Sequence, residues 1–378
     1  MTARWSLIGV ACIAVVPVFG ATAAPSVTRF VFTSDAHFGI TRPAFRGGVN
    51  VNSRVVNHAL VDRLTDVERF AGPIDFVVEG GDIANRSEIS VAGGIQSAAT
   101  SWQEFREEYL ERLRLRASDG TRTPVYVVPG NHDLSNALGW HSPLRPATDP
   151  SSVVAIYNLM LAPRRPLTVD AYEGARDLIA TTREVHGVHY VFLHLWPDSR
   201  MRSWLERDLQ RVSATTPVVL FTHDQPDVEA KHLRNPNGDG GLDAQDRFEN
   251  LLGDMLTDGT SIDDATVAEQ RALAEFLQAH PNVVAYFHGN SNWNEFYDWH
   301  GPDNTLHLPV FRVDSPMKGR LSSRDETQLS FHVAEVDAHA ATLTVRECLW
   351  NADPQHPSAP LVWGAQRTIS LRPSAGHQ

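Results

Sequence analysis

The sequence predicts an α/β fold with mixed sheets flanked by helices. Short runs of β-branched and aromatic residues, typical of buried strands, recur at residues 29–33, 76–78, 125–128, 189–193, 218–221 and 283–287. Amphipathic helical patterns lie between several of them, at residues 55–70, 102–115, 201–212 and 267–280. Strands that alternate with helices favour a sheet whose faces are covered by those helices.

The last part of the chain, about residues 307–372, has a different pattern. Strand-like segments at residues 311–313, 328–333 and 341–346 follow one another without a helical pattern between them. We therefore expect an antiparallel, β-rich portion that completes the fold. No linker separates it from the preceding residues, so residues 24–378 are predicted to form a single domain.

The first 23 residues have the layout of a secretory signal peptide. Arg4 supplies a positive charge, residues 7–19 form an uncharged apolar stretch, and Ala21-Thr22-Ala23 provides the small residues of a cleavage site. The apolar stretch is shorter than the roughly 20 residues that a membrane-spanning helix needs. We therefore expect residues 1–23 to be removed, the remaining chain to lack a transmembrane anchor, and the protein to be secreted or periplasmic.

The charge of the chain argues against a nucleic-acid partner. It has 45 acidic and 33 basic residues and a formal net charge of −12. An acidic surface repels nucleic acid at long range, and the sequence contains no basic patch that would reverse this. The two cysteines, Cys12 in the signal segment and Cys348 in a strand-like segment, leave no pair for a disulfide in the mature chain.

Polar side chains that bind metal ions follow five of the predicted strands. In open α/β sheets, sites form beyond the carboxyl ends of the strands, so these loops are expected to meet in one crevice. The residues, in chain order, are Asp35, His37, Asp82, Asn131, His132, Asp133, His223, Asn290 and Asn292.

This set of ligands suits two divalent metal ions. Carboxylate, imidazole and amide groups bind manganese, zinc or iron, and no thiolate is present among them. A carboxylate such as Asp82 can bridge two ions. Two ions about 3.5–4 Å apart can clamp both ends of an in-line displacement at phosphorus.

The ordered motifs resemble those of the calcineurin-like metallophosphoesterases. That family has Asp-x-His, Gly-Asp, Gly-Asn-His-Asp or Glu, a lone His, and Gly-His-x-His, and the similarity spans about residues 29–292. The resemblance implies an αββα sandwich and a metal-dependent hydrolysis of a phosphate mono- or diester. A small phosphoester is then the expected substrate, and metal-bound hydroxide the expected nucleophile.

The resemblance also implies a role for each matching residue. Asp35 and His37 would bind the first metal ion, Asp82 would bridge, and Asn131 and His223 would bind the second.

Two further residues of the third motif match catalytic positions of the family. His132 would be the general acid near the leaving group, and Asp133 would orient the ring of His132.

The fifth motif departs from the family pattern, because Gly289-Asn290-Ser291-Asn292 replaces Gly-His-x-His. If the amide oxygens take over, Asn290 binds the second ion and Asn292 the first. Metal binding is then weaker, or shifted toward manganese, magnesium or calcium. His288, two residues earlier, is another candidate ligand. The alternatives are a site with one ion, and a catalytically weak or inactive binding protein on the same fold.

Residues 235–246 resemble an EF-hand calcium loop. Oxygen-bearing side chains occupy loop positions 1, 3, 5, 9 and 12, with glycine at position 6. Asn235 at position 1 and Asp246 at position 12 reduce the charge and the reach of this loop. A structural calcium site and a Gly/Asn-rich turn capped by Asp243 both remain open. The substrate itself is not identified by the sequence.

Overall fold

The computed structural model describes residues 27–85, 96–138, 148–234, 250–255 and 262–372, with the side chains of residues 262–266 excepted. The predicted signal peptide at residues 1–23 and the predicted calcium loop at residues 235–246 lie outside the described residues. None of the described helices is both long and apolar enough to cross a membrane.

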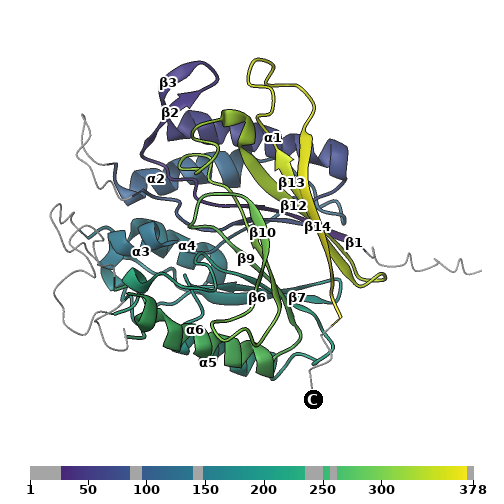
Figure 1. The fold of residues 1–378 in the computed structure, drawn as a ribbon. Helices are drawn as coiled ribbons and strands as arrows, with labels where there is room; N and C mark the ends of the chain where they lie inside the picture. The colour runs from purple at the N-terminus through teal and green to yellow at the C-terminus, as the bar shows by residue number, and fades with distance from the viewer. Residues whose placement is uncertain (1–26, 86–95, 139–147, 235–249, 256–261, 373–378) are drawn as a thin grey trace, which may run out of the picture.

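Two six-stranded mixed sheets pack face to face in the centre of the molecule (Figure 1). The first sheet has the strand order β14-β13-β12-β1-β4-β5 and the second β10-β11-β9-β8-β7-β6. The first contains β1 (Val27–Thr33), β4 (Phe76–Glu79), β5 (Val125–Val127), β12 (Ser330–Asp337), β13 (Thr342–Leu349) and β14 (Val362–Ser370). The second contains β6 (Ala180–Val185), β7 (Val188–Leu193), β8 (Val218–Phe221), β9 (Val283–His288), β10 (Glu295–Trp299) and β11 (Leu308–Arg312).

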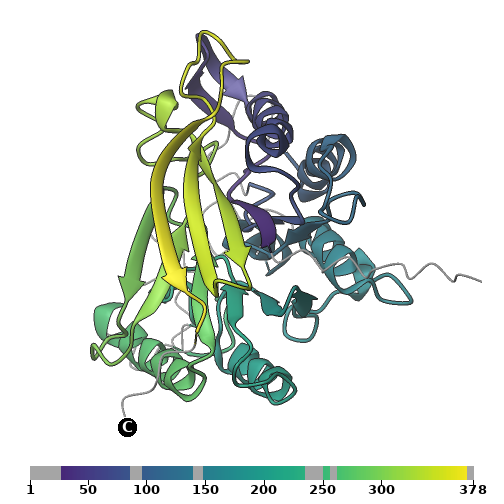
Figure 2. The ribbon, with the colours of Figure 1, turned by 90° about the vertical axis from the view of Figure 1, so that its right-hand side faces the viewer.

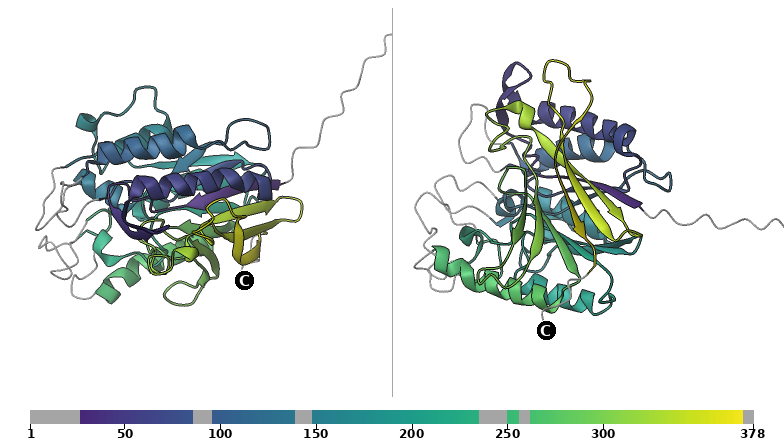
Figure 3. Two further views of the ribbon diagram at one scale, coloured as in Figure 1. Left: turned by 90° about the horizontal axis from the view of Figure 1, so that it is seen from above. Right: turned by 45° about the vertical axis from the view of Figure 1, so that its right-hand side comes forward.

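Helices lie on the outer sides of both sheets, which gives an α/β/β/α arrangement (Figure 3). Helix α1 (Ser53–Ala71) covers the first sheet, whereas α5 (Ser199–Leu209) and α6 (Ile262–Ala279) cover the second. The shorter helices α2 (Ala98–Phe105), α3 (Asn131–Leu138) and α4 (Ser151–Leu161) lie at the side of the molecule. The predicted fold class, mixed sheets flanked by helices, is confirmed.

Helix α1 illustrates how the sequence specifies these outer layers. The side chain of Asn52 accepts a hydrogen bond from the backbone N–H of Arg54 and caps the first turn. Apolar residues then recur every three or four positions and are buried against the sheet, as a helix with one core-facing stripe requires. They include Val56, Leu60, Leu64 and Val67.

Aromatic side chains fill the space between the two sheets. Phe30 on β1 lies across from Phe221, Phe287 and Tyr190 of the second sheet, with ring centroids 5.5, 5.4 and 5.9 Å away. All four side chains are fully buried. Each such burial contributes about 1.5–3 kcal/mol, so this cluster fixes the two sheets relative to each other.

Two details of the predicted elements are different in the structure. The predicted helix at residues 102–115 ends as an α-helix at Phe105 and continues as a π-helical segment, Arg106–Arg112. In the β-rich C-terminal portion, β12, β13 and β14 are antiparallel and form the curved edge of the first sheet (Figure 2). Strand β11 instead belongs to the second sheet, where it is antiparallel to β10 but parallel to β9.

The parallel strands align their carboxyl ends at one edge of the molecule. In the first sheet Thr33 of β1 pairs with Glu79 of β4, which pairs with Val127 of β5. In the second sheet Phe221 of β8 pairs with Phe287 of β9. The loops that follow these strands therefore begin at the same level.

A buried histidine on β12 links stability to pH. The Nε2 atom of His332 lies 2.6 Å from Asn294 Oδ1, and the rings of Phe32 and Phe296 pack against the imidazole. Burial lowers the pKa of His332 to about 3. The unfolded chain takes up this proton near pH 6.5 and the folded chain does not, so the free energy of unfolding falls as the pH drops from 6.5 toward 3.

Replacing His332 with glutamine, which keeps an N–H donor for Asn294 but does not titrate, is expected to weaken this dependence. Urea unfolding at pH 7 and pH 4 should show that the wild type loses about 3 kcal/mol more stability than the His332→Gln variant. Equal losses in the two proteins would show that His332 is not the group responsible.

Candidate metal centre

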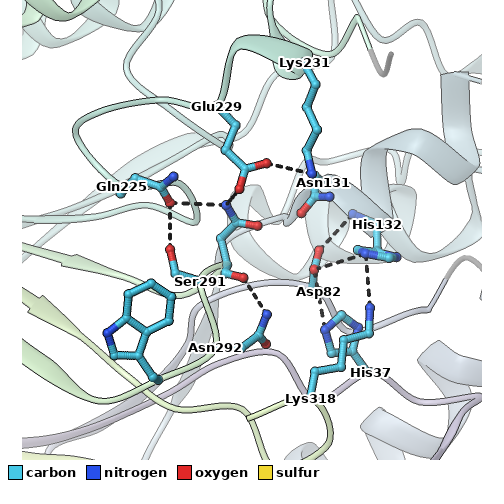
Figure 4. Close-up of a pocket in the computed structure, with 12 residues that line it drawn as sticks. His37, Asp82, Asn131, His132, Gln225, Glu229, Lys231, Ser291, Asn292 and Lys318 are labelled. Carbon is cyan, nitrogen blue, oxygen red and sulfur yellow. Dashed lines mark hydrogen bonds and ion pairs between the residues drawn. The ribbon is translucent and has the colours of Figure 1, made fainter. Parts of the chain in front are cut away.

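Five loops at the aligned strand ends surround a pocket of about 440 Å³ (Figure 4). They follow β1, β4, β5, β8 and β9, as the sequence predicted. The pocket is lined by twelve residues: His37, Asp82, Asn131, His132, Gln225, Glu229, Lys231, Asn290, Ser291, Asn292, Trp293 and Lys318.

The backbone of the candidate ligands is unusual. The φ angles of Asp35, His37, Asp82, Asn290 and Asn292 are 59°, 42°, 56°, 60° and 61°, in the left-handed region. Each such residue costs roughly 1–2 kcal/mol relative to the right-handed conformation. Hydrogen bonds between the first two loops help to hold this geometry, from the backbone N–H groups of Asp35 and His37 to the carbonyl groups of Gly81 and Asp82 at 2.9 Å each. Such backbone strain concentrates at functional sites.

Two glycines allow the loops to approach closely. A Cβ atom at Gly130 would overlap the carboxylate of Asp82, and one at Gly289 would overlap Ser34 and the carboxylate of Asp35. Only glycine fits at these two positions, so the motifs that contain Asn131 and Asn290 require it for steric reasons.

Asp82 lies at the centre of the candidate ligands (Figure 4). Its Oδ2 atom is 3.7 Å from His37 Nε2 and 3.8 Å from His132 Nε2, and its Oδ1 atom is 3.4 Å from His223 Nε2. Among the described residues, two groups of ligand atoms lie within 4.8 Å of one another, His37 with Asp82 and His132, and Asp35 with Asp82 and His223. Asp82 is common to both groups, which is the arrangement that a bridging carboxylate requires.

The Nε2 atom of His223 faces oxygen atoms of Asn131 and Asp82. In a neutral ring this nitrogen carries no proton, because the proton is on Nδ1. Its Nδ1 atom lies 2.7 Å from the carbonyl oxygen of Gly80, so Nδ1 carries a proton and donates it. Its Nε2 atom faces Asn131 Oδ1 at 3.0 Å and the Asp82 carboxylate. Although burial acts in the opposite direction, the Asp82 carboxylate raises the pKa of His223 well above its usual value. A metal cation bound to Nε2 could take the place of this proton and neutralise the Asp82 carboxylate.

Several buried polar atoms at the site have no hydrogen-bond partner among the described residues. They are Asp35 Oδ1, both ring nitrogens of His37, and Asn292 Oδ1. Leaving a buried polar group unsatisfied costs about 1–3 kcal/mol. Burial, aided by the charge of Lys318, lowers the pKa of His37, which keeps this ring neutral and able to bind a cation. These atoms fit a divalent metal ion.

The two amides of the fifth motif are oriented by their N–H groups. Asn290 Nδ2 donates to Gln225 Oε1 at 3.2 Å and to Glu229 Oε1 at 3.3 Å, so its carbonyl oxygen points the other way. Asn292 Nδ2 donates to the backbone carbonyl oxygen of Asn290 at 2.6 Å. The nitrogen of each amide is thus used in hydrogen bonds within the loops, which leaves the side-chain oxygen as the atom that could bind a cation.

His288 does not replace the missing imidazoles. Its Nδ1 atom donates to the carbonyl oxygen of Gly289 at 2.9 Å, and its Nε2 atom lies 3.0 Å from the hydroxyl of Tyr297. Both ring nitrogens of His288 thus contact groups other than Asp82.

Asp133 does not orient the ring of His132, contrary to our expectation. Its Oδ1 atom accepts hydrogen bonds from the backbone of Ala84 at 3.0 Å and the hydroxyl of Ser152 at 2.7 Å. Its Oδ2 atom accepts from the backbone of Ile83 at 3.3 Å and Gly130 at 3.0 Å. Asp133 therefore joins the loop of Asp82 to the loop of Asn131. Burial and the nearby Asp82 raise the pKa of Asp133 to about 6.

Four pocket residues were not identified from the sequence motifs. Gln225 and Glu229 follow His223 closely and hold the Asn290 amide, whereas Lys231 and Lys318 contribute ammonium groups. Lys318 lies in the turn after β11, a sixth strand that ends at this edge. The sequence contained one signal for Lys231 and Lys318, because they are the only two lysines of the chain.

Comparison with known proteins agrees with this geometry. The family model for calcineurin-like phosphoesterases matches residues 28–315, and the chain belongs to this family. A comparison with curated protein sequences finds no relative.

Among solved structures, a dimetal phosphatase from Danio rerio has a similar fold, with 11% identity, a TM-score of 0.50, and coverage of 91% of this chain and 99% of that chain. The phosphoesterase YfcE from E. coli also matches, at 10% identity and a TM-score of 0.32, with 91% of this chain and all of that chain covered. At these identities the likeness concerns the fold alone.

Proposed function

We propose that this protein is a secreted or periplasmic phosphoesterase that depends on two divalent metal ions and hydrolyses a small phosphate mono- or diester. The observation that carries the proposal is the position of Asp82, which lines the pocket and is shared by two groups of buried ligand atoms. Membership of the calcineurin-like phosphoesterase family supports the reaction class. The location rests on the signal-peptide pattern of residues 1–23.

The chain offers two overlapping sets of ligands around Asp82. Asp35 and His37, whose Oδ1 and Nε2 atoms lie 3.6 Å apart, would hold one ion together with Asn292. Asn131 and His223, whose Oδ1 and Nε2 atoms lie 3.0 Å apart, would hold the other together with Asn290, with Asp82 common to both. When bound, two such ions lower the pKa of water and neutralise charge on the phosphoryl group.

His132 is placed to transfer a proton to the leaving group. Its ring lines the pocket beside Asp82, and its backbone N–H donates to Asp82 Oδ1 at 2.8 Å. This hydrogen bond holds the backbone of His132 beside the shared carboxylate. A ring in this position, next to the shared carboxylate, suits a general acid.

The proposal is tested by turnover and metal analysis on one sample. Residues 24–378 are expressed, stripped with a chelator, and supplied separately with manganese, zinc, iron, magnesium or calcium. p-Nitrophenyl phosphate and bis(p-nitrophenyl) phosphate are then assayed. We expect hydrolysis only after metal is restored, and folded, metal-loaded protein without turnover of either ester would contradict the proposal.

The amides of the fifth motif should set the metal preference. Imidazole favours zinc, whereas amide oxygen suits manganese, magnesium or calcium. The double variant Asn290→His with Asn292→His is expected to raise the affinity for zinc relative to manganese by at least about tenfold. Competition with a chromophoric chelator measures both affinities, and an unchanged ratio would show that neither amide is a ligand.

A non-catalytic binding protein on the same fold is the second candidate, because both imidazoles of the fifth motif are absent. The same assay separates the candidates, since a binding protein would stay silent with every metal.

A further inference from the structure

Lysine is almost absent from this protein, and both lysines lie at the candidate metal centre. Of the 33 basic residues, only Lys231 and Lys318 are lysines, and the other 31 are arginines. Both line the pocket around Asp82. They are 87 residues apart in the sequence and follow different strands, so their meeting results from the fold.

The two ammonium groups reach the site from opposite sides (Figure 4). Lys231 belongs to the short 3-10 helix Ala230–His232, and its Nζ atom lies 2.7 Å from Glu229 Oε2. The Nζ atom of Lys318 lies 3.3 Å from His132 Nε2. The space between them contains the Asp82 carboxylate and the proposed general acid.

The turn that carries Lys318 is fixed to a ligand loop. The hydroxyl of Ser315 donates to the carbonyl oxygen of Asp35 at 2.9 Å. The same hydroxyl oxygen accepts the backbone N–H groups of Met317 at 3.1 Å and Lys318 at 2.9 Å. The backbone of Lys318 is thus held in a fixed position relative to the Asp35 loop.

Lysine and arginine offer different chemistry to a phosphate. An ammonium is a compact point charge with three rotatable donors, whereas a guanidinium is a broad, planar fork. A compact cation fits beside crowded ligands where a fork does not. The two lysines also balance Asp82 and Glu229, so the side chains that line the pocket carry no net formal charge before any ion binds.

We propose that Lys318 and Lys231 bind the oxygens of a terminal phosphate dianion, so that the site prefers phosphate monoesters to diesters. This inference rests on the proposed phosphoesterase function. A monoester offers one more negative charge and one more unsubstituted oxygen than a diester, and two ammonium groups in addition to metal ions match that difference.

The first test measures binding of inorganic phosphate to the manganese-loaded protein by calorimetry. The Lys318→Met and Lys231→Met variants keep the length of the side chain and remove its charge. Each is expected to weaken phosphate binding by roughly 10- to 100-fold, with manganese affinity unchanged. Arg324→Met, which removes an exposed charge from the loop that follows Lys318, is the matched control and should bind phosphate as the wild type does.

The second test uses the scarcity of lysine. Pyridoxal phosphate followed by borohydride labels amines, and this chain offers only Lys231, Lys318 and its N-terminus. Mass spectrometry should show that inorganic phosphate protects both lysines and not the N-terminus, and that diethyl phosphate at the same concentration protects neither. Protection by diethyl phosphate equal to that by phosphate would overturn the preference for a dianion.

The two proposals fail in different ways. If phosphate binds equally to the wild type and to both lysine variants while esters are still hydrolysed, the lysine assignment is wrong and the phosphoesterase function stands. If the lysines are protected by phosphate but no ester is turned over, the function fails and the anion site remains.

Discussion

Replacing Asp82 with asparagine is expected to abolish turnover and to remove bound metal. The variant keeps the shape of the side chain. Its Oδ1 atom can still accept the backbone N–H of His132, which lies 2.8 Å from Asp82 Oδ1 in the wild type. The fold should therefore survive. The carboxylate is lost at the point where the two ligand groups meet. Mutation of a residue that only hydrogen-bonds to a metal ligand typically lowers metal affinity or activity by about 10–100-fold. Loss of the shared ligand itself should therefore lower activity by more than about 100-fold.

Turnover of p-nitrophenyl phosphate and metal content by mass spectrometry measure this effect. Asp170→Asn, at an exposed position far along the chain, is the control for loss of one negative charge. An Asp82→Asn protein that keeps both its metal and the wild-type rate would show that Asp82 does not hold the catalytic ions.

Replacing His132 with glutamine is expected to separate catalysis from metal binding. Loss of a general acid typically costs about 10²–10⁴-fold in rate. The loss should be large for an alkyl phosphate, whose leaving group needs a proton, and small for p-nitrophenyl phosphate, whose leaving group is stable as an anion. Metal content should stay at the wild-type level, because the other donors around Asp82 remain.

Kinetics on the two esters, with metal analysis of the same samples, check this expectation. An equal rate loss for both esters would contradict the proton-donor role of His132. Loss of metal in the variant would instead assign His132 to the ligands, which its place in the group with His37 and Asp82 allows.

The ends of the parallel strands could be located from the sequence because buried parallel strands have a clear sequence pattern. Segments such as Val218–Phe221 are fully buried, so they appear as continuous apolar runs. Polar residues that follow directly after such runs stand out, and this is why Asp82 and His223 could be found. Strand β14 was not predicted, because most of its residues are exposed and its sequence has no apolar run.

The interactions between loops could not be predicted from residue types. Asp133 matches a family motif, yet its carboxylate binds backbone N–H groups of two loops, which no spacing in the sequence reveals. The orientation of the Asn290 amide depends on Gln225 and Glu229, which come from another loop. Lys318 follows a strand of the second sheet, and its neighbour His132 follows a strand of the first.

The hydrogen bonds of Asp133 have a consequence for how the protein acquires its metal. Because this carboxylate fastens the Asp82 loop to the Asn131 loop through protein groups alone, the relative position of these two loops does not depend on an ion. An incoming ion meets Asp82 and Asn131 on loops that are already joined, so less of its binding energy is spent on arranging them. An ion can then leave and return without separating the two loops.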